Sequence, residues 1–169
     1  GQTGQTQPGP GMRKLAAEVG REDESRLDML HRLSAGILER VEYKTGTTHS
    51  RTIAEEAFAA ANGVCQDHAH IFIGIARSLG IPARYVSGYL MMNDRIDQEA
   101  GHAWAEAYVA ELGWVGFDIS NGISPDARYV RVATGRDYRD AAPVTGISFG
   151  TTSTVLEVDV AVEQQQVQQ

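Results

Sequence analysis

The sequence has little cysteine, little positive charge and no long apolar run, and each shortage excludes a class of protein. One cysteine among 169 residues can form neither an intrachain disulfide nor a cysteine-rich zinc or iron–sulfur site. A formal net charge of −7 argues against nucleic-acid binding, which needs a concentrated basic face. No apolar run reaches the roughly 18 residues of a membrane-spanning helix, so we expect no membrane insertion. Sparse cysteine and the lack of a visible signal peptide favour a reducing, cytoplasmic location.

The composition predicts one folded domain between two polar ends. A hydrophobic content of 42% suits one globular domain with a core of its own. The ends, GQTGQTQPGP and EQQQVQQ, are rich in Gln and Gly and poor in apolar residues. We therefore expect a disordered tail or a cloning remnant over residues 1–20, a folded domain over residues 21–161 and a disordered tail over residues 162–169.

The first half of the folded region has the apolar spacing of helices. From about Glu22 to Val41, apolar residues recur at steps of three and four, which predicts one amphipathic helix. Thr52 and Glu55 fit a capping box at the start of a short helix that runs through Ala61.

The next helix carries the single cysteine. Apolar residues from Cys65 to Leu79 share one helix face, and Gly80 lies where a left-handed C-terminal cap is expected. Asn62 or Gly63 can cap the other end. Cys65 therefore belongs to the first turn of a mostly buried helix.

After this helix the apolar period changes from about 3.6 to two, which is typical of strands. The predicted strands are ARYVSGYL, HAWAEAYV, LGWVGFD, RYVRVA and STVLEVDV, with GRDYRD left as a polar loop. Helices followed by antiparallel strands predict an α+β domain, in which N-terminal helices pack on an antiparallel sheet.

The hairpin between the second and third strands brings two polar residues together. A turn centred on Ala110 places His102 opposite Asp118, and directly opposite side chains lie within hydrogen-bonding reach. A slip of one residue would move the two to opposite faces. In the same register Trp104 and Trp114 share the His102 face, where they shield the His–Asp bond or fill the core.

Cys65, His102 and Asp118 could together form a nucleophile, a base and an orienting group. A thiol is a weak nucleophile at its free pKa of about 8.5, and the positive end of a helix dipole and a neighbouring imidazolium both favour the thiolate. The position of Cys65 in the first helical turn supplies the helix dipole. The imidazolium is supplied if the His102 strand packs across the helix start. Asp118 would hold the other ring nitrogen of His102.

Each of these residues also has an ordinary structural explanation. A lone cysteine on an apolar helix face usually packs in the core, and an Asp at a strand end usually forms a turn. His68 and His70 point about 200° apart on a helix, so they cannot chelate one ion together, and we expect no metal. Residues alone therefore leave both an enzyme and a non-catalytic protein open.

Three stretches resemble the bacterial transglutaminase-like superfamily of cysteine proteases and amidases. They are NGVCQDHAHIFIGIARSLGIPARYVSGYL, GHAWAEAYVAELGWVGFDISNG and DARYVRVATGRDYRDAAPV, and the resemblance runs from about Leu27 to Val160. It implies a papain-like fold with Cys65 on the central helix, His102 and Asp118 on adjacent strands, and an acyl-enzyme thioester formed from an amide or peptide.

Such an acyl transfer requires no cofactor, and nothing in the residues chooses the acyl acceptor. Hydrolysis is favoured over amine transfer because water needs no dedicated binding site. The alternative is a peptide-binding module that keeps the groove without turnover. The chain departs from the family pattern at Ile119-Ser120, where members have Pro-Thr, and at His68, where members often have an aromatic residue. Both departures leave the three candidate residues in place.

Overall fold

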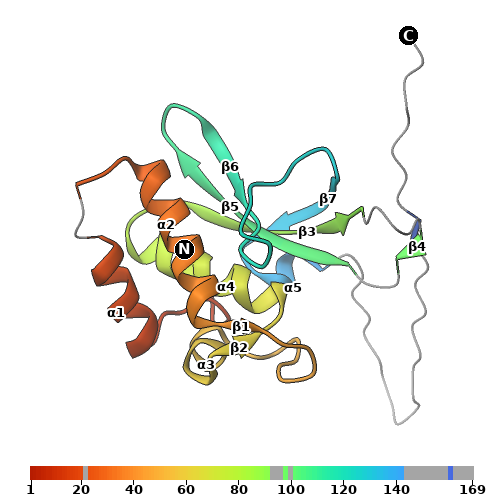
Figure 1. Ribbon diagram of the computed structural model, residues 1–169, viewed down its shortest axis with the longest axis horizontal. Helices are drawn as coiled ribbons and strands as arrows, with labels where there is room; N and C mark the ends of the chain where they lie inside the picture. Colours follow the sequence, from red (N-terminus) through yellow and green to blue (C-terminus); the bar gives the residue numbers. More distant parts are fainter. Residues whose placement is uncertain (21–22, 92–96, 99–100, 143–159, 162–169) are drawn as a thin grey trace.

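A four-stranded antiparallel sheet with helices packed against it forms the fold (Figure 1). The computed structural model describes residues 1–20, 23–91, 97–98, 101–142 and 160–161. In these residues the helices are α1 Pro10–Val19, α2 Arg26–Arg40, α3 Ala54–Ala60, α4 Cys65–Ser78 and α5 Tyr138–Ala141. The strands are β1 Glu42–Tyr43, β2 Asn62–Gly63, β3 Ala83–Leu90, β4 Asp97–Gln98, β5 His102–Val109, β6 Gly113–Phe117, β7 Tyr129–Gly135 and β8 Val160–Ala161. This arrangement confirms the predicted α+β class.

Helix α4 is the centre of the core. It contacts α1, α2, α3, β3 and β5, and every residue from its third position to its twelfth is buried. Each fully buried Ile or Phe side chain contributes roughly 1.5–3 kcal/mol relative to an exposed one, so this helix anchors the fold. Gly80 has φ +77° just beyond the helix, the left-handed conformation that its position predicts.

A short parallel ladder leads into the start of α4. Strand β1 pairs with β2, which runs directly into the helix. The N-cap is Val64, not the expected Asn62 or Gly63. Asp67 closes the helix start, because its Oδ2 accepts hydrogen bonds from the Val64 N–H at 2.9 Å and from the Thr48 hydroxyl at 2.6 Å. Cys65 is thus the first helical residue.

The predicted capping box of α3 is wrong in its residues. The N-cap is Ile53, and Glu56 accepts the Ile53 N–H at 3.3 Å. The Thr52 hydroxyl instead accepts the His49 N–H at 3.0 Å. Glu55 instead accepts hydrogen bonds from backbone N–H groups at the start of α1.

The expectation of a disordered tail over residues 1–20 differs from the structure. Residues Pro10–Val19 form α1, and the side chains of Met12, Leu15 and Val19 are buried. The composition of this segment did not reveal the tertiary contacts that order it. The expected tail over residues 162–169 and most of the STVLEVDV strand lie outside the described residues.

The sheet has the order β6-β5-β3-β7, and the hairpin register differs from the prediction. Glu106 pairs with Gly116 rather than with Trp114, a shift of two residues. The Leu112 N–H donates to the Val109 carbonyl at 2.9 Å, and Gly113 follows with φ +80°, so the turn is centred one residue later than expected. Two residues are one full period of a strand, so every side chain keeps its predicted face.

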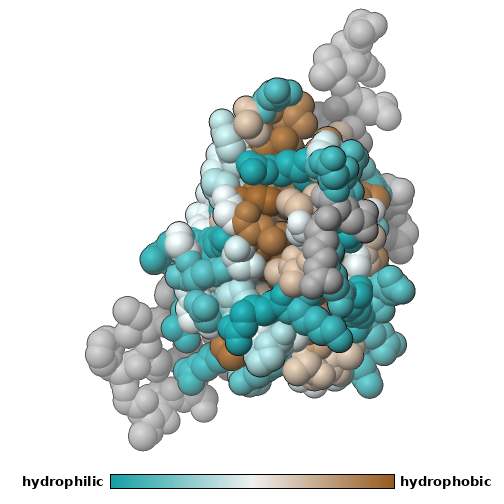
Figure 2. Space-filling view, turned by 90° about the vertical axis from the view of Figure 1, so that its left-hand side faces the viewer, coloured by the Kyte–Doolittle hydropathy of each residue, from teal (hydrophilic) through white to brown (hydrophobic). Residues whose placement is uncertain are grey.

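The surface carries no membrane-spanning element in the described part. None of the described helices is both long and apolar enough to cross a bilayer. The side of the molecule that lies on the left in Figure 1 shows polar side chains around a few separate apolar patches (Figure 2).

The predicted polar loop at residues 135–140 contains the start of α5, a helix too short for apolar periodicity to reveal.

Candidate active site

Cys65 lies at the exposed end of the buried helix. It is the first residue of α4 and is half-buried, whereas the middle of the helix is closed to solvent. The first N–H groups of a helix have no partner within it, and the dipole makes this end positive. The fold therefore places the sulfur at the positive end of the helix, where solvent has access.

His102 stands between Cys65 and Asp118. It is the first residue of β5, whose following alanines pack against α4. Its Nε2 lies 2.7 Å from Oδ2 of Asp118, and Cys65 lies close enough to the ring to raise its pKa. The structure thus brings together the three residues that the sequence predicted as a site, although Asp118 is not directly opposite His102 in the ladder.

The electrostatics favour a charged His102. Burial lowers its pKa, but the hydrogen bonds to Asp118 and Cys65 and the negative charges of both groups outweigh burial and raise the pKa to about 9. Asp118 responds in the opposite direction: burial raises its pKa, and the hydrogen bonds and charge of His102 lower it below its ordinary value. At neutral pH the pair is an imidazolium and a carboxylate.

Two further side chains hold Asp118, and sequence reasoning missed both. The carboxyl group is fully buried and accepts the Tyr129 hydroxyl at 2.6 Å and the Asn121 side-chain amide at 2.7 Å. Burial and the bond to Asp118 raise the pKa of Tyr129, so its hydroxyl stays a donor. The strand of Tyr129 was predicted, but its contact across the sheet was not visible in the spacing.

The two tryptophans have different surroundings. Trp104 is buried with its ring centroid 6.1 Å from that of His102 and 5.3 Å from that of Tyr129. Its ring therefore packs beside both His102 and Tyr129, the two partners of Asp118. Trp114 is exposed, and the Arg84 guanidinium stacks over it at 4.1 Å.

The two departures from the family pattern contact each other. His68 is fully buried, with Nδ1 2.7 Å from the Ser120 hydroxyl and Nε2 2.8 Å from the Val41 carbonyl. Burial lowers the pKa of His68, so the ring is neutral. The histidine and the serine therefore form one bond that ties the helix start to the loop after Asp118.

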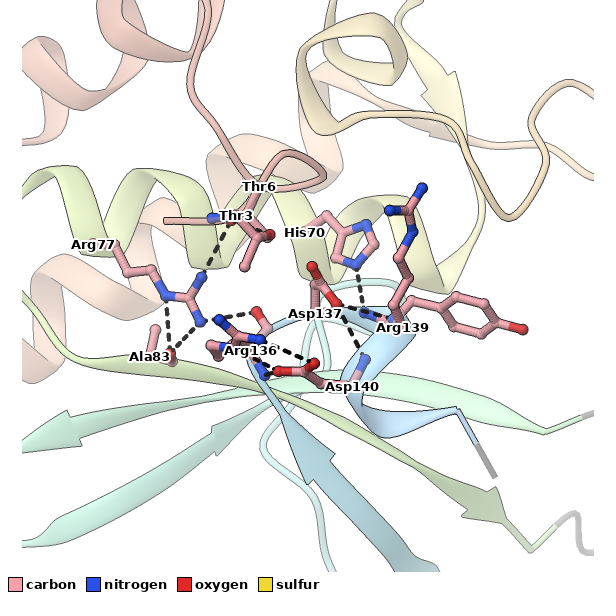
Figure 3. Close-up of polar contacts among 10 residues, drawn as sticks. Thr3, Thr6, His70, Arg77, Ala83, Arg136, Asp137, Arg139 and Asp140 are labelled. Carbon is pink, nitrogen blue, oxygen red and sulfur yellow. Dashed lines mark hydrogen bonds and ion pairs between the residues drawn. The ribbon is translucent and has the colours of Figure 1, made fainter. Parts of the chain in front are cut away.

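His70 and the segment around α5 form a structural contact rather than a ligand site (Figure 3). His70 Nε2 accepts the Tyr138 N–H at 3.0 Å, and Asp137 caps α5 through the Arg139 and Asp140 N–H groups. The close-up shows His70 pointing from α4 toward this segment. Burial lowers the pKa of His70 to about 4. In the described ranges no group of three or more His, Cys, Asp or Glu residues is placed to hold a metal ion.

Known proteins resemble this chain in sequence and in structure. Residues 13–119 match the family described as the Transglutaminase-like superfamily. An uncharacterised protein of Mycobacterium leprae is 38% identical over 130 residues, which are 73% of this chain and 45% of that protein. The structure of a candidate cysteine protease from Cytophaga hutchinsonii superposes with a TM-score of 0.73 at 30% identity, covering 92% of this chain and 52% of the other.

A relative with a named activity matches more weakly. The protein-glutamine gamma-glutamyltransferase of Pseudomonas aeruginosa is 29% identical over 90 residues, which are 49% of this chain and 14% of that enzyme. The chain spans about half the length of the Mycobacterium leprae relative and of the Cytophaga hutchinsonii structure. The matched family region includes all three candidate residues.

Proposed function

The chain belongs to the transglutaminase-like superfamily, and from that membership we propose that it is a thiol-dependent acyl-transfer enzyme acting on amide or peptide bonds. The observation that carries the proposal is the placement of His102. Its Nε2 lies 2.7 Å from Oδ2 of Asp118, and Cys65 lies close enough to raise the pKa of the ring. A base that is oriented by a carboxylate and lies beside a thiol is the arrangement that activates a cysteine nucleophile.

In the proposed mechanism Cys65 attacks the carbonyl carbon of an amide as a thiolate. The electron pair of the C=O bond moves to oxygen, and the Cys65 backbone N–H at the helix start donates to that oxyanion. His102 gives its proton to the leaving amine, which departs as the C–N bond breaks. Asp118 stabilises the imidazolium before this step, and the product is a thioester on Cys65.

Water or a second amine then resolves the thioester. We propose hydrolysis, because water needs no dedicated binding site. The named activity of the Pseudomonas aeruginosa relative supports amine transfer as the second possibility. The nucleophile must stay reduced, so we also propose that the domain acts in the cytoplasm on a peptide or amide substrate, away from membranes and nucleic acid. Cell fractionation tests the compartment.

A non-catalytic module is the second candidate function. A domain with the same groove could bind a peptide without turnover, and the departures at His68 and Ser120 favour a reshaped cleft. An unassisted thiol loses thiolate about tenfold for each pH unit below roughly 8.5, so such a module would react slowly at pH 6. Alkylation therefore separates the two candidates.

The decisive measurement is the rate at which iodoacetamide alkylates the protein between pH 5 and 10, followed by intact mass. We expect rapid alkylation at pH 6, because His102, whose pKa is about 9, is then an imidazolium beside the sulfur. A neighbouring imidazolium favours the reactive thiolate. His102→Ala should slow the reaction at pH 6 by about 100-fold. Asp126→Asn, in an exposed ion pair with Arg128, is the matched control and should change nothing.

Turnover of a peptide and amide library completes the test. Cys65→Ser should abolish it while leaving the circular dichroism spectrum unchanged. Turnover should decline above about pH 9, because His102 then loses the proton that it donates to the leaving group. Slow alkylation at pH 6 together with no turnover would favour the binding module, and full activity in Cys65→Ser would refute the mechanism.

A further inference from the structure

A pocket of about 410 Å³ lies between helix α2 and the segment at and beyond the end of β6. One wall is the face of α2 that carries Ser34 and Leu38. The other wall is Phe117, the last residue of β6, together with residues 122–123. Pockets that bind small molecules measure roughly 300–1,000 Å³. This pocket, which we call the α2 pocket, therefore has the size of a small-molecule site.

Apolar side chains make up much of the lining of the α2 pocket, namely Leu38, Phe117 and Ile123. Phe117 is fixed by the core, because its ring stacks on that of Phe72 in α4 with centroids 5.0 Å apart. The His31 ring, also in the lining, packs edge-on against Phe117 at 5.0 Å. Contact with such side chains removes the apolar surface of a ligand from water. The pocket thus suits a molecule with an apolar body.

The hydroxyl of Ser34 adds a polar group to the same lining. Ser34 is only 6% exposed, and it borders the pocket. In the part of the chain that the structure describes, its hydroxyl forms no hydrogen bond. Buried polar groups are normally hydrogen-bonded, and one without a bond destabilises the fold. A polar group of a bound molecule would satisfy this hydroxyl.

The charge at the α2 pocket is negative. Glu39 is exposed, lines the pocket and forms no ion pair with any residue that the structure describes. It lies in the last turn of α2, where the helix dipole is also negative. The neighbouring Arg40 is engaged elsewhere, by Glu18 at 3.3 Å and by the Gly36 carbonyl at 3.0 Å. A positive group on the ligand complements this end of the pocket.

We propose that the α2 pocket binds a small primary amine with an apolar body. The ammonium group pairs with Glu39, and the body packs against Phe117 and Ile123. An ammonium group has three N–H donors, so it can also bond to an acceptor such as the Ser34 hydroxyl. The site is separate from Cys65 and His102, and binding there requires no acyl transfer. The proposal therefore stands or falls independently of the proposed function.

Two probes of equal size isolate the charge. Phenethylamine and 2-phenylethanol have the same apolar body and differ in an ammonium group against a hydroxyl. Each is titrated into the ¹⁵N-labelled full chain at pH 7.5, and the backbone amide shifts are followed by NMR. We expect the amide signals of Phe117, Gly122 and Ile123 to move, with a Kd for the amine of about 1 mM or below. The alcohol should bind about fivefold more weakly, because it lacks the pairing with Glu39.

Two variants locate the binding. Glu39→Gln should remove the advantage of the amine, so that both probes bind with the affinity of the alcohol. Glu111→Gln, in the exposed hairpin turn, has the same charge change and should preserve the fivefold difference. Ala35→Trp places a large ring in the pocket and should weaken both probes by at least about tenfold. Ala59→Trp, on the exposed side of α3, is its matched control and should change neither affinity. Thermal melting checks the fold of each variant.

Each other outcome overturns part or all of the inference. Equal binding of the two probes to the wild-type chain, or a difference that persists in Glu39→Gln, overturns the assignment of an amine. Binding that survives in Ala35→Trp, or shifts at Cys65 and His102 with none at Ile123, overturns the site. No shift at all with the amine at 20 times the expected Kd overturns the whole inference. None of these results bears on alkylation of Cys65, which tests the proposed function.

Discussion

At the scale of single residues, the charge of Asp118 decides the state of the candidate site. Burial of a carboxylate without partners would favour its neutral form. Here three side chains, those of His102, Tyr129 and Asn121, converge on one oxygen at 2.6–2.7 Å. Hydrogen bonds to a charged group contribute more than those between neutral groups, roughly 1.5–3 kcal/mol each, and together they outweigh desolvation. The carboxylate then keeps His102 protonated.

Asp118→Asn should therefore lower the pKa of His102 from about 9 toward the ordinary value of 6.5. The substitution removes a negative charge at hydrogen-bonding distance, which destabilises the imidazolium, so the proton leaves at lower pH. NMR titration of the His102 ring protons measures the shift directly and requires no substrate. At pH 8 the variant's histidine should be mostly neutral, whereas the wild-type histidine stays mostly charged.

Asp126→Asn is the control for this titration as well, because its charge is exposed and paired with Arg128. It should leave the titration of His102 unchanged. A His102 pKa that stays near 9 in Asp118→Asn would mean that Cys65 alone maintains the charge. Turnover should fall by orders of magnitude in the Asp118 variant and by little in the control.

The three candidate site residues could be identified from the sequence because few residues suit their chemical roles. Only one cysteine is available, and His102 and Asp118 lie at the ends of strands that the alternation of apolar residues reveals. Tyr129 was not predictable as a neighbour of the site. Its contact with Asp118 depends on β7 pairing with β3, and that pairing leaves no signal in local spacing.

At the scale of elements, the alternation of apolar residues predicted the bounds of the strands well but not the register of the hairpin. Strands β3 and β5 have the bounds that the alternation predicts. The register depends on the turn, and the left-handed Gly113 moves its centre from Ala110 to Glu111. The error preserved the faces only because it was an even number of residues. A shift of one residue would have separated His102 from Asp118 in the prediction.

Helix α4 illustrates how packing reverses an intrinsic preference. Gly→Ala inside a helix usually stabilises a protein by about 0.5–1 kcal/mol. At Gly74 a Cβ would lie 2.1 Å from the Thr6 carbonyl oxygen and 2.8 Å from Met12 Cε. Overpacking of this kind costs about 1–3 kcal/mol, which exceeds the gain in helix propensity. The glycine lets the N-terminal segment cross the helix closely.

Gly74→Ala should therefore lower the free energy of unfolding by roughly 1–2 kcal/mol. Gly36→Ala, inside α2, is the matched substitution with the opposite sign. Its Cβ would meet the flexible end of Arg40 at 3.3 Å and Leu15 Cδ1 at an ordinary van der Waals distance of 4.0 Å, so we expect a gain of up to about 1 kcal/mol. Urea unfolding of both variants measures the difference. Equal stabilisation in the two would show that the N-terminal segment does not lie on α4.

At the scale of the whole molecule, the N-terminal segment is part of the fold and not an appendage. Gln2 donates its side-chain amide to the Gly74 carbonyl at 2.8 Å, and α1 covers part of α4. Low hydrophobicity predicted disorder, because composition averages over a segment and does not count its partners. Those partners are distant in sequence, so no local pattern could have indicated the contact.

Glu55 joins the N-terminal segment to the helical layer. Its carboxylate on α3 accepts the N–H groups of Gly9, Gly11 and Met12 at 2.7–3.1 Å, at the start of α1. A carboxylate there satisfies donors that have no partner within the helix and complements the positive end of the dipole. A residue that looked like part of a local capping box is therefore a cap between helices.

Glu55→Ala should accordingly loosen α1 without disturbing the candidate site. We expect amide exchange to accelerate in residues 12–19 and the free energy of unfolding to fall by about 1–2 kcal/mol. Glu18→Ala, which removes an exposed ion pair with Arg40 at 3.3 Å, should cost under about 0.5 kcal/mol and serves as the control. Alkylation of Cys65 should keep its wild-type rate, because the bonds of this cap join α3 to α1 and involve none of the three candidate site residues. Unchanged exchange in α1 would mean that Met12, Leu15 and Val19 hold the helix by packing alone, and slower alkylation would show that the segment supports the site.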